Sequence, residues 1–207
     1  MKLYSASKAP SPRRVVMLLA EKSLLDQVEI VSLDLAAGDN LRDEFVQQNP
    51  MAKVPMLALS SGECLSEAGA INRYLDQCYP EPNLCGVSPL EQAHIDMWDR
   101  HVEIGLLYPV GMAFQHGSGF FKDRMTPVPA WGQECARSAV AFLQVLEQQL
   151  ARHAYVAGER FTVADITALC ALDFAKVIQV RIDDRHPSIQ RWYAECQARP
   201  SYAASWQ

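Results

Sequence analysis

The sequence predicts an α/β module followed by an all-helical module. Over residues 1–78 the hydrophobic positions alternate between the spacing of strands and the spacing of helices, whereas every periodic segment from residue 90 onward is helical. Between these regions, residues 79–89 are rich in proline and also contain Asn83 and Gly86, so they continue neither kind of element. We therefore expect two domains, residues 1–78 and 90–207, joined by a linker over residues 79–89.

The first module is expected to have the element order β-α-β-α-β-β-α. It begins with a short apolar strand over residues 2–5, and residues 12–22 carry the broad apolar face of a helix. Two strands, 54–59 and 63–65, are separated by Ser60-Ser61-Gly62, which is typical of a hairpin turn. The remaining elements are expected to be a strand over 28–35, a short helix over 43–48 and a helix over 68–78. This order predicts a sheet with both parallel and antiparallel pairs.

Long helical segments fill the second module. Residues 90–116 have the length of one long helix, in which Pro109 is expected to cause a kink because it lacks an N–H and crowds the preceding turn. Residues 131–152 carry an apolar seam at steps of three and four. Residues 161–180 are very apolar, and residues 188–198 place apolar side chains on one side of a helix.

Composition and charge exclude several classes of protein. The 207 residues are 49% hydrophobic, which is not typical of a disordered chain. The net charge is −5, and no run of Lys or Arg builds a basic face, so we expect neither nucleic acid nor membrane as a partner. The chain starts without the apolar segment of a signal peptide, and no apolar stretch is long enough to cross a bilayer. We expect a soluble, cytoplasmic protein.

Six cysteines are scattered along the chain. None forms a C-x-x-C pair, and no histidine lies at a short metal-ligand spacing from them. We therefore expect no metal site and interpret most of these cysteines as small buried side chains. Cys78 and Cys85 flank the proline-rich stretch and are candidates for exposure.

A first candidate site lies at Ser11-Pro12. Serine is a favoured N-cap residue and proline suits the first helical position, so we expect Ser11 to cap a helix that starts at Pro12. A hydroxyl beside the free N–H groups of a helix start also suits an anion. Capping alone is the simpler interpretation of this segment. Arg13 and Arg14 follow, and one of them is a candidate to add positive potential beside a bound anion, although we expect arginines exposed on a helix to be solvated.

A second candidate site combines Lys53-Val54-Pro55 with Glu67. A cis bond before Pro55 would turn the Val54 main chain outward, which would leave its N–H and C=O free to pair with a peptide ligand. Glu67 lies at the start of the next helix, where a carboxylate suits the helix dipole and is able to hold a ligand amine. Each part also has a purely structural interpretation, as a turn and as a cap.

A third motif, Phe161 to Ile166, is structural. Thr162 and Asp165 have the spacing of a variant capping box, and Phe161 and Ile166 have that of a hydrophobic staple. We therefore interpret Asp165 as a residue that organises the helical core and not as a catalytic acid.

Together, and in this order, these segments resemble the glutathione transferases. The resemblance covers essentially the whole chain: residues 1–4 leading into 10–22, then 49–55, 67–75 and 158–166. It implies a thioredoxin-like N-terminal domain followed by a helical C-terminal domain. Members of the family are typically cytosolic homodimers that bind glutathione on the first domain and a hydrophobic electrophile against the helices.

The resemblance assigns glutathione, as co-substrate, to six residues. It places Ser11 beside the sulfur, Lys53 near the glycine carboxylate, and Val54, before a cis Pro55, in main-chain pairing with the cysteinyl part. It places Glu67 at the γ-glutamyl amine and the Ala68 N–H at the γ-glutamyl carboxylate. Relatives usually have serine at position 68, and serine-type members often have serine at position 9, where this chain has Ala9. Tyr108 and Met112, together with Phe114 and His116, are candidates for the second-substrate cleft, and they are equally compatible with core or dimer contacts.

Three activities are compatible with these residues. The leading hypothesis is a transferase whose glutathione thiolate attacks an electrophilic carbon, with Ser11 stabilising the thiolate. Glutathione-dependent reduction of disulfides or peroxides is a second possibility. The third is a non-catalytic binding protein with the same fold, a hypothesis that Ala9 and Ala68 favour and that Ser11, Val54-Pro55 and Glu67 oppose. An isomerase of the maleylacetoacetate kind is less favoured, because the Ser-Ser-Cys stretch expected there is absent.

Overall fold

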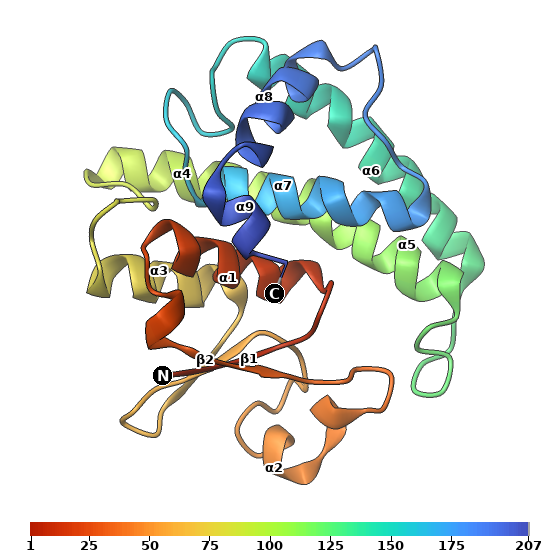
Figure 1. Ribbon diagram of the computed structural model, residues 1–207. Coiled ribbons are helices and arrows are strands. Elements are labelled where there is room, and N and C mark those ends of the chain that lie inside the picture. Colours follow the sequence, from red (N-terminus) through yellow and green to blue (C-terminus); the bar gives the residue numbers. More distant parts are fainter. Residues whose placement is uncertain (207) are drawn as a thin grey trace. The chain divides into compact units, whose positions relative to one another are not determined.

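The structure is a computed structural model that describes residues 1–206, and it confirms the α/β and all-helical parts predicted from the sequence (Figure 1). The chain divides into two compact units. The first contains Met1–Asn83 together with the C-terminal residues from Arg199 onward, and the second is Leu84–Ala198. The division after Asn83 falls within the proline-rich stretch 79–89.

A mixed four-stranded sheet forms the centre of the first unit, in the order β2-β1-β3-β4. Its strands are β1 (Lys2–Ser5), β2 (Glu29–Ser32), β3 (Met56–Ala58) and β4 (Cys64–Ser66). β1 and β2 are parallel, with α1 (Pro10–Glu21) in the connection between them, whereas β3 pairs antiparallel with both β1 and β4. The predicted element order and the predicted hairpin are both confirmed.

The register of the sheet brings three connecting segments to one edge. Tyr4 pairs with Met56, and Met56 pairs in turn with Ser66, so these residues form one row across β1, β3 and β4. Because β3 runs antiparallel to its neighbours, its beginning lies beside the ends of β1 and β4. Neighbouring strands are about 4.8 Å apart, so the three segments reach this edge within about 10 Å of one another.

Two helices pack the core of the first unit. In α1, the run Val15 to Leu19 is almost completely buried, and in α3 (Ala68–Cys78) the buried side chains include Ile71 and Leu75. The short elements of this unit are the helix α2 (Asp43–Val46) and the 3₁₀ turns Leu25–Gln27 and Asp39–Leu41. The helix α9 (Pro200–Ala204) also belongs to this unit and lies beside α1 (Figure 1). The sequence patterns did not predict α9.

The helical unit contains α4 (Pro89–Val102), α5 (Tyr108–Ser118), α6 (Pro129–Leu150), α7 (Val163–Ala175) and α8 (Pro187–Gln197), with a 3₁₀ turn at Lys176–Ile178. Helix α4 runs into α5 through a π-helical segment, Glu103–Leu107, that ends just before Pro109. Proline cannot donate to the carbonyl four residues before it, and widening the preceding turn accommodates that loss. The sequence predicts a kink at Pro109, and the structure has a π-helical turn before this residue, between two separate helices. Among the described residues, no helix is both long and apolar enough to span a membrane.

The capping box at the start of α7 is confirmed. The Thr162 N–H donates to Asp165 Oδ2 at 2.8 Å, and the other carboxylate oxygen, Oδ1, accepts from the Val156 N–H at 2.9 Å and from Trp192 Nε1 at 2.8 Å. Asp165 is fully buried, and this burial raises the pKa of its carboxyl to about 6. Asp165 thus joins three segments of the helical core, as its structural interpretation predicts.

Candidate functional site

The first turn of α1 begins two residues earlier than a Ser11 cap requires. Ala9 is the N-cap residue, with extended backbone angles, and its carbonyl accepts the Arg13 N–H at 3.4 Å. Pro10 therefore occupies the first helical position and Ser11 the second. The prediction that Ser11 is the N-cap is wrong, because Pro10 starts the helix as readily as Pro12 would: neither proline has an N–H to leave unpaired.

This shift leaves Ser11 with two donors at the positive end of α1. Pro10 and Pro12 have no N–H, so Ser11 supplies the free main-chain donor of the first turn. Within the part of the chain that the structure describes, neither its N–H nor its hydroxyl has a hydrogen-bond partner. Ser11 is half-buried. An anion at this position would meet the helix dipole and both donors.

The segment before β3 presents unpaired main-chain groups. The Val54-Pro55 peptide is cis, as the sequence suggested, and Pro55 is buried directly before β3. Among the described residues, none makes a hydrogen bond to the Val54 main chain. The preceding turn is held by Asn49, whose buried side chain donates to the Lys53 carbonyl at 2.6 Å. The Lys53 ammonium group is exposed and has no ion-pair partner among residues 1–206.

Glu67 occupies a backbone conformation that favours glycine. It is the N-cap residue of α3, with φ 68° and ψ 120°. Such a conformation costs a non-glycine residue about 1–3 kcal/mol, and it is often retained at functional sites. Its exposed carboxylate has no partner in the described chain, and the neighbouring N–H of buried Ala68 is likewise unpaired at the helix start.

The sheet register places these groups at the same edge of the first unit. The segment that leads to Ser11 follows β1, Val54 and Pro55 precede β3, and Glu67 and Ala68 follow β4. The edge combines donors for anions with a carboxylate for an ammonium group and a main-chain segment for a peptide. Of the described residues, no three or more His, Cys, Asp or Glu side chains are grouped so that they would hold a metal.

Arg13 and Arg14 are buried, so the prediction that they are solvated is wrong. Arg13 is 4% exposed and Arg14 is 1% exposed. The guanidinium of Arg13 donates from Nε to Ser205 Oγ at 3.0 Å and lies 3.6 Å from the centre of the Trp206 ring. Local sequence gave no sign of this burial because the covering residues are almost the whole chain length away.

The helical unit presents the two predicted second-substrate residues on one helix. Tyr108, which is exposed, and Met112, which is half-buried, are one turn apart in α5. Phe114, another cleft candidate, lies at the centre of an aromatic cluster whose other members the sequence did not predict, and its ring centre is 5.4 Å from that of Phe174 in α7. Two rings of the following loop complete the cluster, Phe120 at 5.7 Å and Phe121 at 6.4 Å from Phe114. Adjacent phenylalanines after the helix-ending Gly119 were the available signal.

The comparisons with known proteins agree with this arrangement. Residues 1–77 match the family described as "Glutathione S-transferase, N-terminal domain", and residues 132–200 match "Glutathione S-transferase, C-terminal domain". Glutathione S-transferase 2 of Saccharomyces cerevisiae is 32% identical over 203 residues, which span 97% of this chain and 87% of that protein. The chain belongs to the glutathione S-transferase family.

Solved structures extend this relationship to the whole fold. Gtt2 of Saccharomyces cerevisiae matches with a TM-score of 0.95 and 31% identity, covering 99% of this chain and all (100%) of that one. A glutathione S-transferase domain-containing protein of Marinobacter aquaeolei VT8 matches with a TM-score of 0.94 and 38% identity, covering 98% of this chain and 100% of that one. The thioredoxin-like first domain and the helical second domain are thus those of the family, whose members use glutathione as co-substrate, and homology to Gtt2 over nearly the full chain identifies a glutathione S-transferase.

Proposed function

We propose that this glutathione S-transferase binds glutathione at the edge of the sheet where β1 and β4 end, and activates its thiol for attack on hydrophobic electrophiles. The observation that carries the proposal is the set of unpaired polar groups gathered there by the strand register. Glutathione is a peptide with one amine, two carboxylates and one thiol. The edge offers a complementary group for each of them.

The assignments follow from charge and hydrogen-bonding capacity. The Glu67 carboxylate binds the γ-glutamyl amine, and the Ala68 N–H donates to the γ-glutamyl carboxylate. The main chain of Val54, set by the cis Pro55, pairs with the cysteinyl part, and Lys53 faces the glycine carboxylate. Since Ala68 lacks the hydroxyl usual in relatives, and a hydrogen bond to a charged group contributes about 1.5–3 kcal/mol, binding is expected to be weaker than in relatives with serine.

Ser11 is the proposed activating residue. Lowering a thiol pKa by two units requires about 2.7 kcal/mol of preferential binding to the thiolate. A hydrogen bond from a hydroxyl to an anion contributes about 1.5–3 kcal/mol, and a helix N-terminus adds about 0.3–1 kcal/mol. Both the hydroxyl and the N–H of Ser11 are unpaired, so the two contributions are sufficient without a metal or a second acid.

The electrophile is assigned to the helical unit. The half-exposed cluster around Phe114 offers ring edges and faces to a planar ligand, and aromatic pairs prefer such edge-to-face geometry. Tyr108 and Met112 add an apolar flank on α5. These side chains favour aromatic electrophiles, which is consistent with a role in detoxification in the cytoplasm.

A homodimer is part of the proposal. Leu90, Met97 and Ile104 recur every seven residues along α4 and the π-helical segment, and all three are exposed, with exposed fractions of 71%, 41% and 58%. A stripe of this kind is typical of a surface covered by another chain. Sedimentation equilibrium is expected to give twice the chain mass, and a monomer mass at micromolar concentration would remove this part of the proposal.

The first experiment is an ultraviolet titration of protein-bound glutathione, in which thiolate absorbance is followed against pH. In the wild type, the thiol pKa of bound glutathione is expected to be about two units lower than in solution. In Ser11→Ala, this pKa is expected to rise most of the way back to its solution value. Ser7→Ala, in the loop before the same helix, is the matched control and is expected to leave the thiol pKa unchanged. Bound glutathione with an unshifted pKa would instead favour the reductase or the non-catalytic binding protein.

A further inference from the structure

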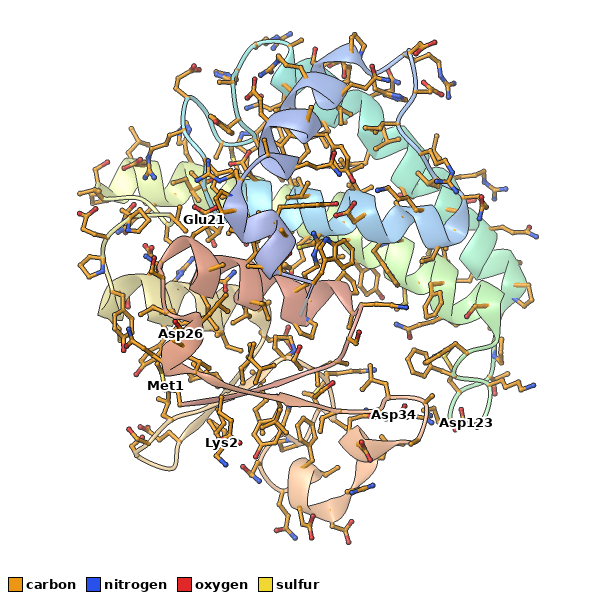
Figure 2. The ribbon with its side chains drawn as sticks, viewed as in Figure 1. Met1, Lys2, Glu21, Asp26, Asp34 and Asp123 are labelled. Atoms are coloured by element: carbon orange, nitrogen blue, oxygen red, sulfur yellow. The ribbon has the colours of Figure 1, made fainter. Side chains whose placement is uncertain are left out.

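The C-terminal residues hold both ends of α1. At its start, Arg13 is bound by Ser205 and Trp206. At its end, the Glu21 carboxylate accepts from Arg199, through Nε and Nη2 at 2.7 Å each, and from the Ser201 hydroxyl. Glu21 is labelled at the end of α1 in Figure 2. All of these residues belong to the first unit.

The contact at Arg13 is a stack of planar groups. The Arg13 guanidinium carbon lies 3.6 Å from the Trp206 ring centre and 5.0 Å from that of Tyr202. The Ser205 hydroxyl, which accepts from Arg13, donates in turn to the Tyr202 carbonyl at 2.7 Å. A planar guanidinium is suited to such stacking, whereas a lysine ammonium group is not.

The first turn of α1 needs this support because its own hydrogen bonds are few. Ala9 provides no side-chain cap, and the two prolines provide no N–H. The Arg13 N–H is the first to close the helix, and its bond to the Ala9 carbonyl is long at 3.4 Å. Helix ends that lack caps fray, so the position of Ser11 depends on contacts that side chains make with other parts of the unit.

We propose that Arg13 and Trp206 are positioning residues for Ser11. The stack fixes Arg13, the fourth residue after the N-cap, and the helix start that contains Ser11 is fixed with it. This inference rests on the proposed function, because it concerns the same thiolate-binding site. It adds that activation of the thiol by Ser11 depends on Trp206, which lies almost 200 residues later in the sequence.

The test compares the two ends of one helix. Trp206→Ala and Arg13→Lys remove the stack near Ser11. Glu21→Gln is the matched control, since it weakens the contact between α1 and α9 about 15 Å from Ser11, at 1.5 Å of rise per residue. For each protein, three quantities are measured: the pKa of bound glutathione, the affinity for S-methylglutathione, which has no thiol, and the melting temperature.

We expect Trp206→Ala and Arg13→Lys to raise the thiol pKa by about one unit, equal to a tenfold fall in the ratio of thiolate to thiol at a given pH. Their affinity for S-methylglutathione is expected to change less than twofold. Glu21→Gln is expected to lower the melting temperature and leave the thiol pKa as in the wild type. If Trp206→Ala does not fold, Ser205→Ala, which removes the acceptor of the Arg13 Nε hydrogen bond, takes its place.

Equal pKa shifts in Trp206→Ala and Glu21→Gln would overturn the inference, because they would show a general loss of structure. An unshifted pKa in Trp206→Ala, or in Arg13→Lys, which keeps the charge, would also overturn it. The proposed function would survive either result, as long as the wild type lowers the thiol pKa. A wild type that leaves this pKa unshifted would overturn both.

Discussion

The Lys22 ammonium lies 2.6 Å from an Asp76 carboxylate oxygen, and both side chains are buried. Lys22 also donates to the carbonyls of Tyr79 at 2.7 Å and Pro82 at 2.8 Å. The end of α1 is thus joined to the end of α3 and to the residues that follow it. A buried lysine is tolerated here because each of its three protons has an acceptor.

Replacing one member of this pair is expected to destabilise the protein strongly. Lys22→Met leaves the Asp76 carboxylate buried without its counter-ion, and such changes cost about 3–5 kcal/mol of unfolding free energy. Urea denaturation followed by circular dichroism measures the loss. Lys2→Met, which removes the exposed ion pair with Glu29 at 3.1 Å, is the control and is expected to change stability little. Equal effects of the two substitutions would contradict the role assigned to burial.

Asp165 is expected to make stability depend on pH between about 4 and about 6. Its pKa is raised from 3.8 to about 6 in the folded protein, so the folded state retains a proton that the unfolded state has lost in this range. The contribution of Asp165 to stability is therefore lost as pH rises through this window. Asp165→Asn does not titrate, so the difference in unfolding free energy, wild type minus variant, is expected to fall over the same range. A difference that is constant with pH would show that the carboxylate is charged throughout.

Gly105 is expected to be intolerant of a side chain. An added Cβ would lie 2.2 Å from Cδ2 of the Phe142 ring, so the ring would have to move. Overpacking of this kind costs about 1–3 kcal/mol, and we expect Gly105→Ala to lower the melting temperature. Gly111→Ala is the matched control, because nothing lies within 4 Å of its added Cβ and alanine favours the helix. A stabilised Gly105→Ala variant would show that Phe142 moves without cost.

Glu67 is expected to lower the stability of the protein and to be required for glutathione binding. Glycine adopts a φ of 68° without strain, so Glu67→Gly should gain up to about 1 kcal/mol of stability while it loses most glutathione binding in calorimetry. Gln179, with φ 62° in the helical unit, provides the control. Gln179→Gly is expected to gain stability and keep its affinity for glutathione. Unchanged affinity in Glu67→Gly would remove this carboxylate from the site.

Local patterns were sufficient to predict most elements of the fold. The alternating residues of the strands and the apolar faces of α3 and α6 depend on the spacing of neighbouring side chains, which the sequence displays directly. The cis Val54-Pro55 bond and the position of Glu67 at the start of α3 were also suggested by short-range chemistry. These features need no knowledge of distant segments.

What local patterns missed depends on contacts between distant residues. Burial of Arg13 depends on Trp206, and the aromatic cluster joins Phe114 to Phe174. The start of α1 was placed wrongly because two prolines offered equivalent starting points, and the chain used the earlier one. The helix α9 is too short to show a hydrophobic periodicity, so the sequence pattern does not predict it. The structure shows that it is held by contacts with α1.

The arrangement of α9 against α1 also bears on how this protein is made. A ribosome produces α1 well before Arg199, with the whole of Leu84–Ala198 in between. N-terminal domains usually fold first during synthesis, yet here the first unit lacks the partners of Arg13 and Glu21 until all of Leu84–Ala198 has been made. A nascent chain that ends before residue 199 therefore has an incomplete first unit, which becomes complete only when the residues from Arg199 onward pack against α1.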